Sequence, residues 1–297
     1  MKLVYEGAEI TDKMTTIRRC ELNQYLDGHI DTMTIAFDNS QGQWTGWAPK
    51  RGDTLQASDD HVNSGKMVVA TVRQEGAEMV LDCAPLLNHQ IGQVKGWKNA
   101  SFTQLARNAG ARLGLTVKFY DVSDHKYEGI EQKGESDLIF LSNLCRLEGC
   151  SMMVSDGTLR IMSEAYLDSL EMSDYTLLAD DCRITDQEYY TGCEVCDGKI
   201  AGKAGSGKGE KTYFSTDRKL ESIGQANRFA ANMLRYANRD RKSGSVLCGS
   251  VLDTLMPGSK IKMTNDYWND KPVIITRARY YLIKQQTKLW FRLLEDK

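Results

Sequence analysis

The chain has little net charge, no run of basic residues and no long apolar stretch. Thirty-eight Lys and Arg residues stand against forty Asp and Glu residues, and no basic cluster is long enough to follow a phosphate backbone, so we expect no nucleic-acid partner. The longest apolar runs, such as MVVATV and PVIIT, are far too short to cross a bilayer, and the amino terminus lacks the apolar core of an export signal. These absences predict a protein that is made in the cytoplasm and does not insert into a membrane.

The cysteine content does not indicate a disulfide framework. Eight cysteines in a chain with no export signal favour reduced thiols, and we expect most of them to be small core residues. A length of 297 residues with 41% hydrophobic content can bury more than one core. The composition therefore predicts two or three domains.

The first segment, residues 1–95, is dominated by short alternating runs. Met33, Ile35 and Phe37 share one face of HIDTMTIAFD, which is typical of a half-buried strand. A hairpin is predicted over residues 66–83, where two alternating arms flank QEGAE. No stretch of this segment has a convincing helical period, so we expect it to be built of strands.

The middle segment, residues 96–170, mixes helices with a hairpin. Ser101 begins a predicted helix that ends near Gly114, and Ser136 begins a second one, since each serine precedes an apolar pattern of helical period. Two apolar arms then surround Asp156 and Gly157, the strongest short hairpin signal in the sequence. A small α+β unit is predicted here.

The third segment, residues 171–297, returns to strands and contains one long helix that begins at Ser222. Phe229 and Met233 lie on its apolar face, and we expect this face to cover the sheet of the same segment. Four basic residues gather near the end of the helix, where cations complement the helix dipole, and they are interpreted as solvated charge. These are Arg235, Arg239, Arg241 and Lys242.

The glycine-rich stretch AGKAGSGKGE has nearly the spacing of a phosphate-binding P-loop between Gly202 and Lys208. A P-loop also needs a buried strand before it, a hydroxyl residue after the lysine and a following helix. Gly209 stands where the hydroxyl should be, and the flanking segments are polar or strand-like. We therefore predict a flexible, solvated connection over residues 198–211, and keep a nucleotide-binding enzyme as an alternative.

Cys193 and Cys196 form a CxxC motif, which leaves a zinc or thiol protein as a second alternative. A structural zinc site needs a second pair of ligands, which Cys182 or Cys248 would have to supply through folding. The histidines, by contrast, are scattered singly through other segments: His29, His61, His89 and His125. The favoured interpretation is a strand with packed thiols.

Other arrangements of catalytic residue types are weak. The run from Ser123 to His125 contains the residue types of a catalytic triad, but neighbours in one loop cannot assemble it alone. The acidic pairs at residues 59–60 and 180–181 are predicted to be surface residues. We predict no catalytic residue, no metal ligand and no cofactor, and therefore no enzyme.

An internal repeat carries more information than these motifs. RGDTLQ precedes the hairpin at residues 66–83, and PGSKIKM precedes another long alternating hairpin at residues 272–294. Gly52 and Gly258 are therefore expected to begin equivalent strands of one β module that occurs twice. When the two hairpins are superposed, we expect Met79, Leu81 and Cys83 to match Leu289, Phe291 and Leu293 on an inward face.

Three stretches of the chain resemble a known family. They are FTQLARNAGARLGL, YEGIEQKGESDLIFLSNLCRLEGCSMMVSDGTLRIMSE and SIGQANRFAANMLRYANRDRKSGSVLCGSVLDTLMPGSKIKM. They are similar to the late control protein D family of contractile phage tails, whose members are baseplate hubs. The likeness covers most of residues 97–297, whereas residues 1–95 match only in style.

The resemblance implies a mainly β fold in which two similar antiparallel, tail-tube-like β-barrels flank the α+β unit. It also implies a homotrimer whose six barrels form a pseudo-sixfold ring between the tail tube and a threefold spike. Expected partners are therefore the chain itself, the tail tube, the spike and other baseplate proteins. The spike is expected to be a separate polypeptide because the chain ends at Lys297. The expected location is the tail baseplate of a phage or phage-like particle, assembled in the host bacterial cytoplasm.

Overall fold

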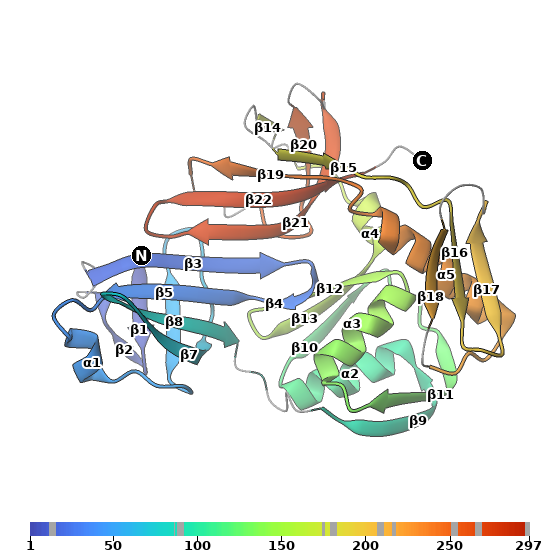
Figure 1. Ribbon diagram of the computed structural model, residues 1–297, viewed down its shortest axis with the longest axis horizontal. Helices are drawn as coiled ribbons and strands as arrows, with labels where there is room; N and C mark the ends of the chain where they lie inside the picture. Colours follow the sequence, from blue (N-terminus) through green and yellow to red (C-terminus); the bar gives the residue numbers. More distant parts are fainter. Residues whose placement is uncertain are drawn as a thin grey trace.

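A computed structural model describes residues 1–11, 16–85, 87, 92–173, 176–178, 183–206, 211–215, 218–250, 255–264 and 269–294. The predicted mainly β fold with an α+β unit is confirmed (Figure 1). Strands from the beginning and the end of the chain meet in one large sheet, and the α+β unit lies beside it. The two predicted β-barrels are not observed, because no set of strands closes into a barrel among the described residues.

The large sheet contains 13 strands, and most of them run in the order β15-β19-β22-β21-β3-β5-β8-β7-β6-β1-β2. The strands from the first segment are β1 (Lys2–Tyr5), β2 (Ala8–Glu9), β3 (Ile17–Tyr25), β5 (Thr32–Asp38), β6 (Thr54–Ser58), β7 (Met67–Glu75) and β8 (Glu78–Pro85). The strands from the third segment are β14 (Thr176–Leu178), β15 (Arg183–Asp186), β19 (Lys242–Cys248), β20 (Lys260–Thr264), β21 (Lys271–Tyr281) and β22 (Gln286–Leu293). One hydrophobic core runs beneath both sets and includes Phe37, Leu81, Ile275 and Phe291.

The two ends of the chain contain the same five-strand module. In the first β module the antiparallel order is β3-β5-β8-β7-β6, and in the second β module it is β15-β19-β22-β21-β20. Both modules also have a register irregularity at the same place in the hairpin, after Val69 in β7 and after Ile275 in β21. The repeat seen in the sequence is therefore a repeat of topology.

Gly52 and Gly258 each lie two residues before equivalent strands, β6 and β20, which confirms the predicted equivalence. Both adopt positive φ, 98° and 93°, which a glycine tolerates because it lacks a Cβ. The amide of Gly52 donates to the carbonyl of Val69 at 2.9 Å, and that of Gly258 donates to the carbonyl of Ile275 at 2.8 Å. Each glycine thus precedes the strand that pairs with the first arm of its hairpin, which is β7 in the first module and β21 in the second.

The predicted match between the hairpins is wrong by two residues. Val69 pairs with Cys83 and Ile275 pairs with Phe291, so Cys83 corresponds to Phe291 and Leu81 to Leu289. The inward face is the predicted one, since Met79, Leu289 and Phe291 are all buried. A shift of two residues preserves the face of a strand, which is why alternation alone could not detect the error.

The α+β unit combines three small sheets with helices. Its strands are β4 (Asp27–Ile30), β9 (Val94–Ser101), β10 (Thr116–Tyr120), β11 (Lys126–Lys133), β12 (Cys150–Ser155), β13 (Thr158–Ser163), β16 (Gly192–Cys196), β17 (Ala201–Gly205) and β18 (Lys211–Ser215). Its helices are α2 (Phe102–Leu113), α3 (Asp137–Leu147), α4 (Glu164–Ser169) and α5 (Ile223–Asn238). The sheet order β10-β13-β12-β4 brings β4, from the first segment, into this unit.

The predicted helix starts are confirmed. The hydroxyl of Ser101 accepts from the amide of Gln104, that of Ser136 from Ile139, and that of Ser222 from Gln225, at 3.1 to 3.4 Å. These bonds satisfy amides that have no partner within the first turn of a helix. The predicted hairpin turn is also confirmed, because Asp156 and Gly157 both have positive φ between β12 and β13.

Helix α5 packs against a different sheet from the predicted one. Phe229 and Met233 belong to the core of the α+β unit, together with Leu144 of α3 and Val195 of β16. Figure 1 shows α5 (orange) packed along β16, β17 and β18. The amphipathic stripe predicted burial correctly, but such a stripe carries no information about which surface covers it.

Helix α1 (Gln43–Trp47) lies in the segment where no helix was expected. The Asn39 side-chain carbonyl accepts from the amides of Trp44 at 2.9 Å and Thr45 at 3.3 Å, and the Trp44 ring stacks on Phe37. A helix of five residues held by one asparagine and one buried indole leaves no periodic pattern in the sequence.

None of the helices in the described ranges is both long and apolar enough to span a membrane.

Asp31, between β4 and β5, is a buried carboxyl group with an incomplete set of partners. It is 4% exposed, and Gln24 Nε2 donates to its Oδ2 at 3.4 Å. Its Oδ1 has no hydrogen-bond partner among the described atoms. Burial raises the pKa of Asp31 to about 8, so the carboxyl group is largely protonated at neutral pH.

Replacing Asp31 with Asn should remove a pH dependence of stability. Below its unfolded pKa the group is protonated in both states, and the native state keeps its full stability. As pH rises toward the raised pKa of about 8, only the unfolded chain ionises, so the wild type loses up to about 1.4 kcal/mol per pH unit. Urea unfolding at several pH values should show a variant that gains relative to wild type as pH rises, and parallel curves would contradict the buried carboxyl group.

Candidate functional site

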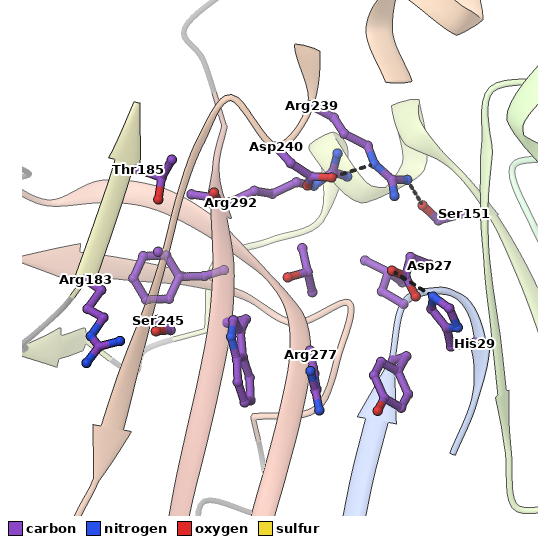
Figure 2. A pocket seen from close by; sticks show the side chains of 17 residues that line it. Asp27, His29, Ser151, Arg183, Thr185, Arg239, Asp240, Ser245, Arg277 and Arg292 are labelled. Atoms are coloured by element: carbon purple, nitrogen blue, oxygen red, sulfur yellow. Dashed lines mark hydrogen bonds and ion pairs between the residues drawn. The ribbon is translucent and has the colours of Figure 1, made fainter. Parts of the chain in front are cut away.

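A pocket of about 490 Å³ lies where the second β module meets the α+β unit (Figure 2). Its lining comes from the end of β3, from β4, β12, β15, β19, β21 and β22, and from the residues that follow α5. Four arginines line it: Arg183, Arg239, Arg277 and Arg292. Two carboxylates, Asp27 and Asp240, are the acidic residues of the lining.

Arg292 takes part in a buried ionic network behind this pocket. Its Nη2 lies 2.5 Å from Glu164 Oε2, and Ser151 Oγ donates to Glu164 Oε1 at 2.6 Å. Arg239 Nη1 lies 3.7 Å from Glu164 Oε1. Burial opposes ionisation of Glu164, but the Arg292 charge and the Ser151 hydrogen bond outweigh it and hold the pKa of Glu164 below its usual value. The network fixes β22 to α4 and to the end of α5.

Arg239 therefore differs from the prediction of solvated charge at the end of this helix. Its side chain is only 10% exposed, and it contacts both Glu164 and Asp240. Arg235 also makes an ion pair, with Asp168 of α4. Arg235 and Arg239 bind the helix to its neighbours, a role that charge clustering in a sequence does not distinguish from solvation.

Arg277 is held between two aromatic rings in the same pocket. Its guanidinium carbon lies 4.8 Å from the Tyr25 ring centroid and 4.4 Å from that of Trp290, and its Nη2 donates to Asn23 Oδ1 at 2.9 Å. Guanidinium groups suit planar acidic groups, and two of the four arginines, Arg239 and Arg292, already pair with carboxylates of the chain. Asp27 and Asp240 are themselves paired with His29 and Arg239.

The Gly202–Lys208 motif does not form a phosphate-binding loop within the described residues. Ala201–Gly205 is strand β17, paired with β16, so the predicted flexible connection over residues 198–211 is wrong for these residues. A Cβ on Gly202 would lie 2.1 Å from the backbone of Ala226, which shows that this glycine lets α5 approach the strand. Residues 207–210 lie outside the described residues.

Cys193 and Cys196 lie on β16, where Cys193 is 3% exposed. Burial raises the pKa of the Cys193 thiol, which disfavours the reactive thiolate. Within the described ranges, His, Cys, Asp and Glu side chains nowhere gather in the groups of three that could hold a metal ion. Cys182 lies outside those ranges, and Cys248 is on β19.

The remaining candidates take structural roles. Asp124 Oδ1 accepts from the amide of Thr103, and His125 Nδ1 lies 2.9 Å from Glu148, a buried carboxylate that also pairs with Arg228. Asp59 accepts from the amides of His61 and Val62 in a turn. His89 and residues 180–181 lie outside the described residues.

No protein-family model matches the chain, and no curated protein sequence matches it. Solved structures do match. The 43 kDa tail protein of prophage MuSo2 from Shewanella oneidensis aligns over 98% of this chain and 97% of its own, with a TM-score of 0.74 and 11% identity. A tail protein from Neisseria meningitidis MC58 aligns over 98% and 95%, with a TM-score of 0.75 and 12% identity.

A third match is the Escherichia coli c3393 protein, a component of the type VI secretion system described as structurally similar to the T4 bacteriophage tail proteins gp27 and gp5. It aligns over 95% of this chain and 74% of its own, with a TM-score of 0.58 and 13% identity. At such identities the likeness shows a shared fold. The chain therefore has the fold of these tail proteins.

Replacing Glu164 with Ala should cost about 3–5 kcal/mol of unfolding free energy, because the buried Arg292 would lose its ionic partner. The exposed Glu171, in the segment after α4, is a matched control whose replacement by Ala should change stability by less than about 0.5 kcal/mol. Urea denaturation followed by circular dichroism measures both. Equal unfolding midpoints for the two variants would show that the network contributes nothing specific.

Proposed function

We propose that this chain is a structural baseplate hub of a contractile tail, of the late control protein D type. In this proposal three copies form a ring of pseudo-sixfold symmetry that joins the sixfold tail tube to a threefold spike protein. The shared fold with phage tail proteins and with a type VI secretion component supports a structural role in such a particle.

The observation that carries the proposal is the duplicated β module. Three identical chains in a closed ring have threefold symmetry, and two similar modules per chain give six similar units around the same axis. A ring of this kind matches a sixfold tube on one side and a threefold spike on the other. A duplicated module thus gives a direct solution to a symmetry mismatch.

A non-enzymatic role accompanies this proposal. Gly202 serves close packing between β17 and α5, and Cys193 is a buried thiol on a strand, so these two residues have structural explanations. The proposed partners are a second and third copy of the chain, the tail tube, the spike and other baseplate proteins. The proposed location is the baseplate of a phage tail or phage-like particle, assembled in the host bacterial cytoplasm.

Light scattering of the purified chain, alone and mixed with its spike protein, tests the oligomeric state. We expect a species of three times the 33.4 kDa chain mass, free or bound to the spike, because six modules require three chains. Mass action can leave the isolated chain partly dissociated, so a concentration series is needed. A stable twofold assembly in either sample would contradict the hub.

A further inference from the structure

Within each chain, one pair of strands joins the two β modules. The carboxyl half of β21 pairs antiparallel with β3, so that Arg277 lies opposite Tyr25, Arg279 opposite Asn23 and Tyr281 opposite Glu21. This pairing buries the inward-facing residues of β21, since Ala278 is 0% exposed and Tyr280 1%. Through this β3–β21 pairing, the large sheet continues from one β module into the other.

In the first β module, the corresponding half of β7 has no such neighbour among the described residues. Thr71–Glu75 of β7 corresponds to Arg277–Tyr281 of β21, because Val69 corresponds to Ile275 on either side of the shared irregularity. Among the described residues, only β8 pairs with this half of β7, and Val72 is 36% exposed where its equivalent Ala278 is buried. An exposed strand edge with an apolar residue invites pairing with another chain.

The complementary edge lies at the other end of the large sheet. Strand β15 occupies in the second β module the position of β3 in the first, and among the described strands only β19 pairs with it. Ile184 lies opposite Gly244 of β19 as Leu22 lies opposite Met33 of β5, which makes Ile184 the equivalent of Leu22. Figure 1 shows β15 and β7 far apart, so one chain cannot join its own two edges.

We propose that β15 of one chain pairs antiparallel with Thr71–Glu75 of β7 in the next chain, in the register that β3 and β21 adopt within a chain. The inference rests on the proposed trimeric hub and assigns its interface. Transferring the internal register places Glu75 opposite Arg183, Gln74 opposite Ile184 and Arg73 opposite Thr185.

The charges at this joint favour the transferred register. Arg183 takes the place of Glu21, and Glu75 takes the place of Tyr281, so a basic residue of one chain meets an acidic residue of the next. Opposite charges on directly facing strand residues stabilise an antiparallel pair. Arg183 and Glu75 are both exposed, and within the single chain Glu75 contacts Arg73 and Arg19.

The proposed contact between chains is head-to-tail, and this property determines which assemblies it can form. One edge of each chain meets a different edge of its neighbour, so the contact is heterologous and generates a ring when the rotation closes. If the β15–β7 pairing between chains repeats the geometry of the β3–β21 pairing within a chain, the same rotation relates each β module of the ring to the next. Three chains then supply six equally spaced β modules, and the edges of β15 and β7 are all paired.

Disulfide trapping tests the register directly. The double variant Arg73→Cys/Thr185→Cys places two thiols on directly opposite residues, where a disulfide can form. Asp186 follows Thr185 and points to the other face of the strand, so Arg73→Cys/Asp186→Cys is the matched control. Non-reducing gels of the full chain should show crosslinked dimers and trimers for the first pair and several-fold less for the control, the two single variants and the parent chain.

Charge exchange provides a second measurement. Glu75→Arg and Arg183→Glu should each weaken trimer formation in light scattering, and the double variant should restore part of it. A trimer that forms normally in every variant, without preferential trapping of residues 73 and 185, overturns the proposed interface and leaves the hub standing. A chain that is neither trapped nor trimeric, with or without its spike protein, contradicts the hub itself and this inference with it.

Discussion

The pairing of β3 with the carboxyl half of β21 is the constraint on which the rest of the structure depends. It makes one sheet from strands that are more than two hundred residues apart in the chain, and it lets both β modules share one hydrophobic core. Because side chains alternate along a strand, this single register decides which residues of both modules face inward. Asn23 strengthens this pairing by accepting from Arg277 and Arg279 at 2.9 and 2.7 Å.

The α+β unit is attached to this sheet by burial and charge rather than by a long strand ladder. Glu164 at the start of α4 brings Arg292 of β22 and Arg239 together, while β4 continues from the turn after β3 into the sheet of the unit. These contacts position the arginine-lined pocket at the junction.

Local signals in the sequence predicted local structure well, and tertiary partners poorly. Serine caps at Ser101, Ser136 and Ser222 and the turn at Asp156 were readable because each depends on neighbouring residues. The duplication was also readable, since Gly52 and Gly258 need the same backbone conformation. The surface that covers α5 and the burial of Arg239 depend on segments distant in the chain, and no local pattern records them. The pocket was missed for the same reason.

In the proposed hub, a duplicated module turns three chains into six similar units. Electron cryo-microscopy of the chain bound to its tail tube protein, reconstructed without imposed symmetry, measures this most directly. For the proposed hub, we expect density that is nearly sixfold across the β modules and threefold across the α+β units. A ring of six complete chains, or β modules that contact the tube in unequal ways, would contradict it.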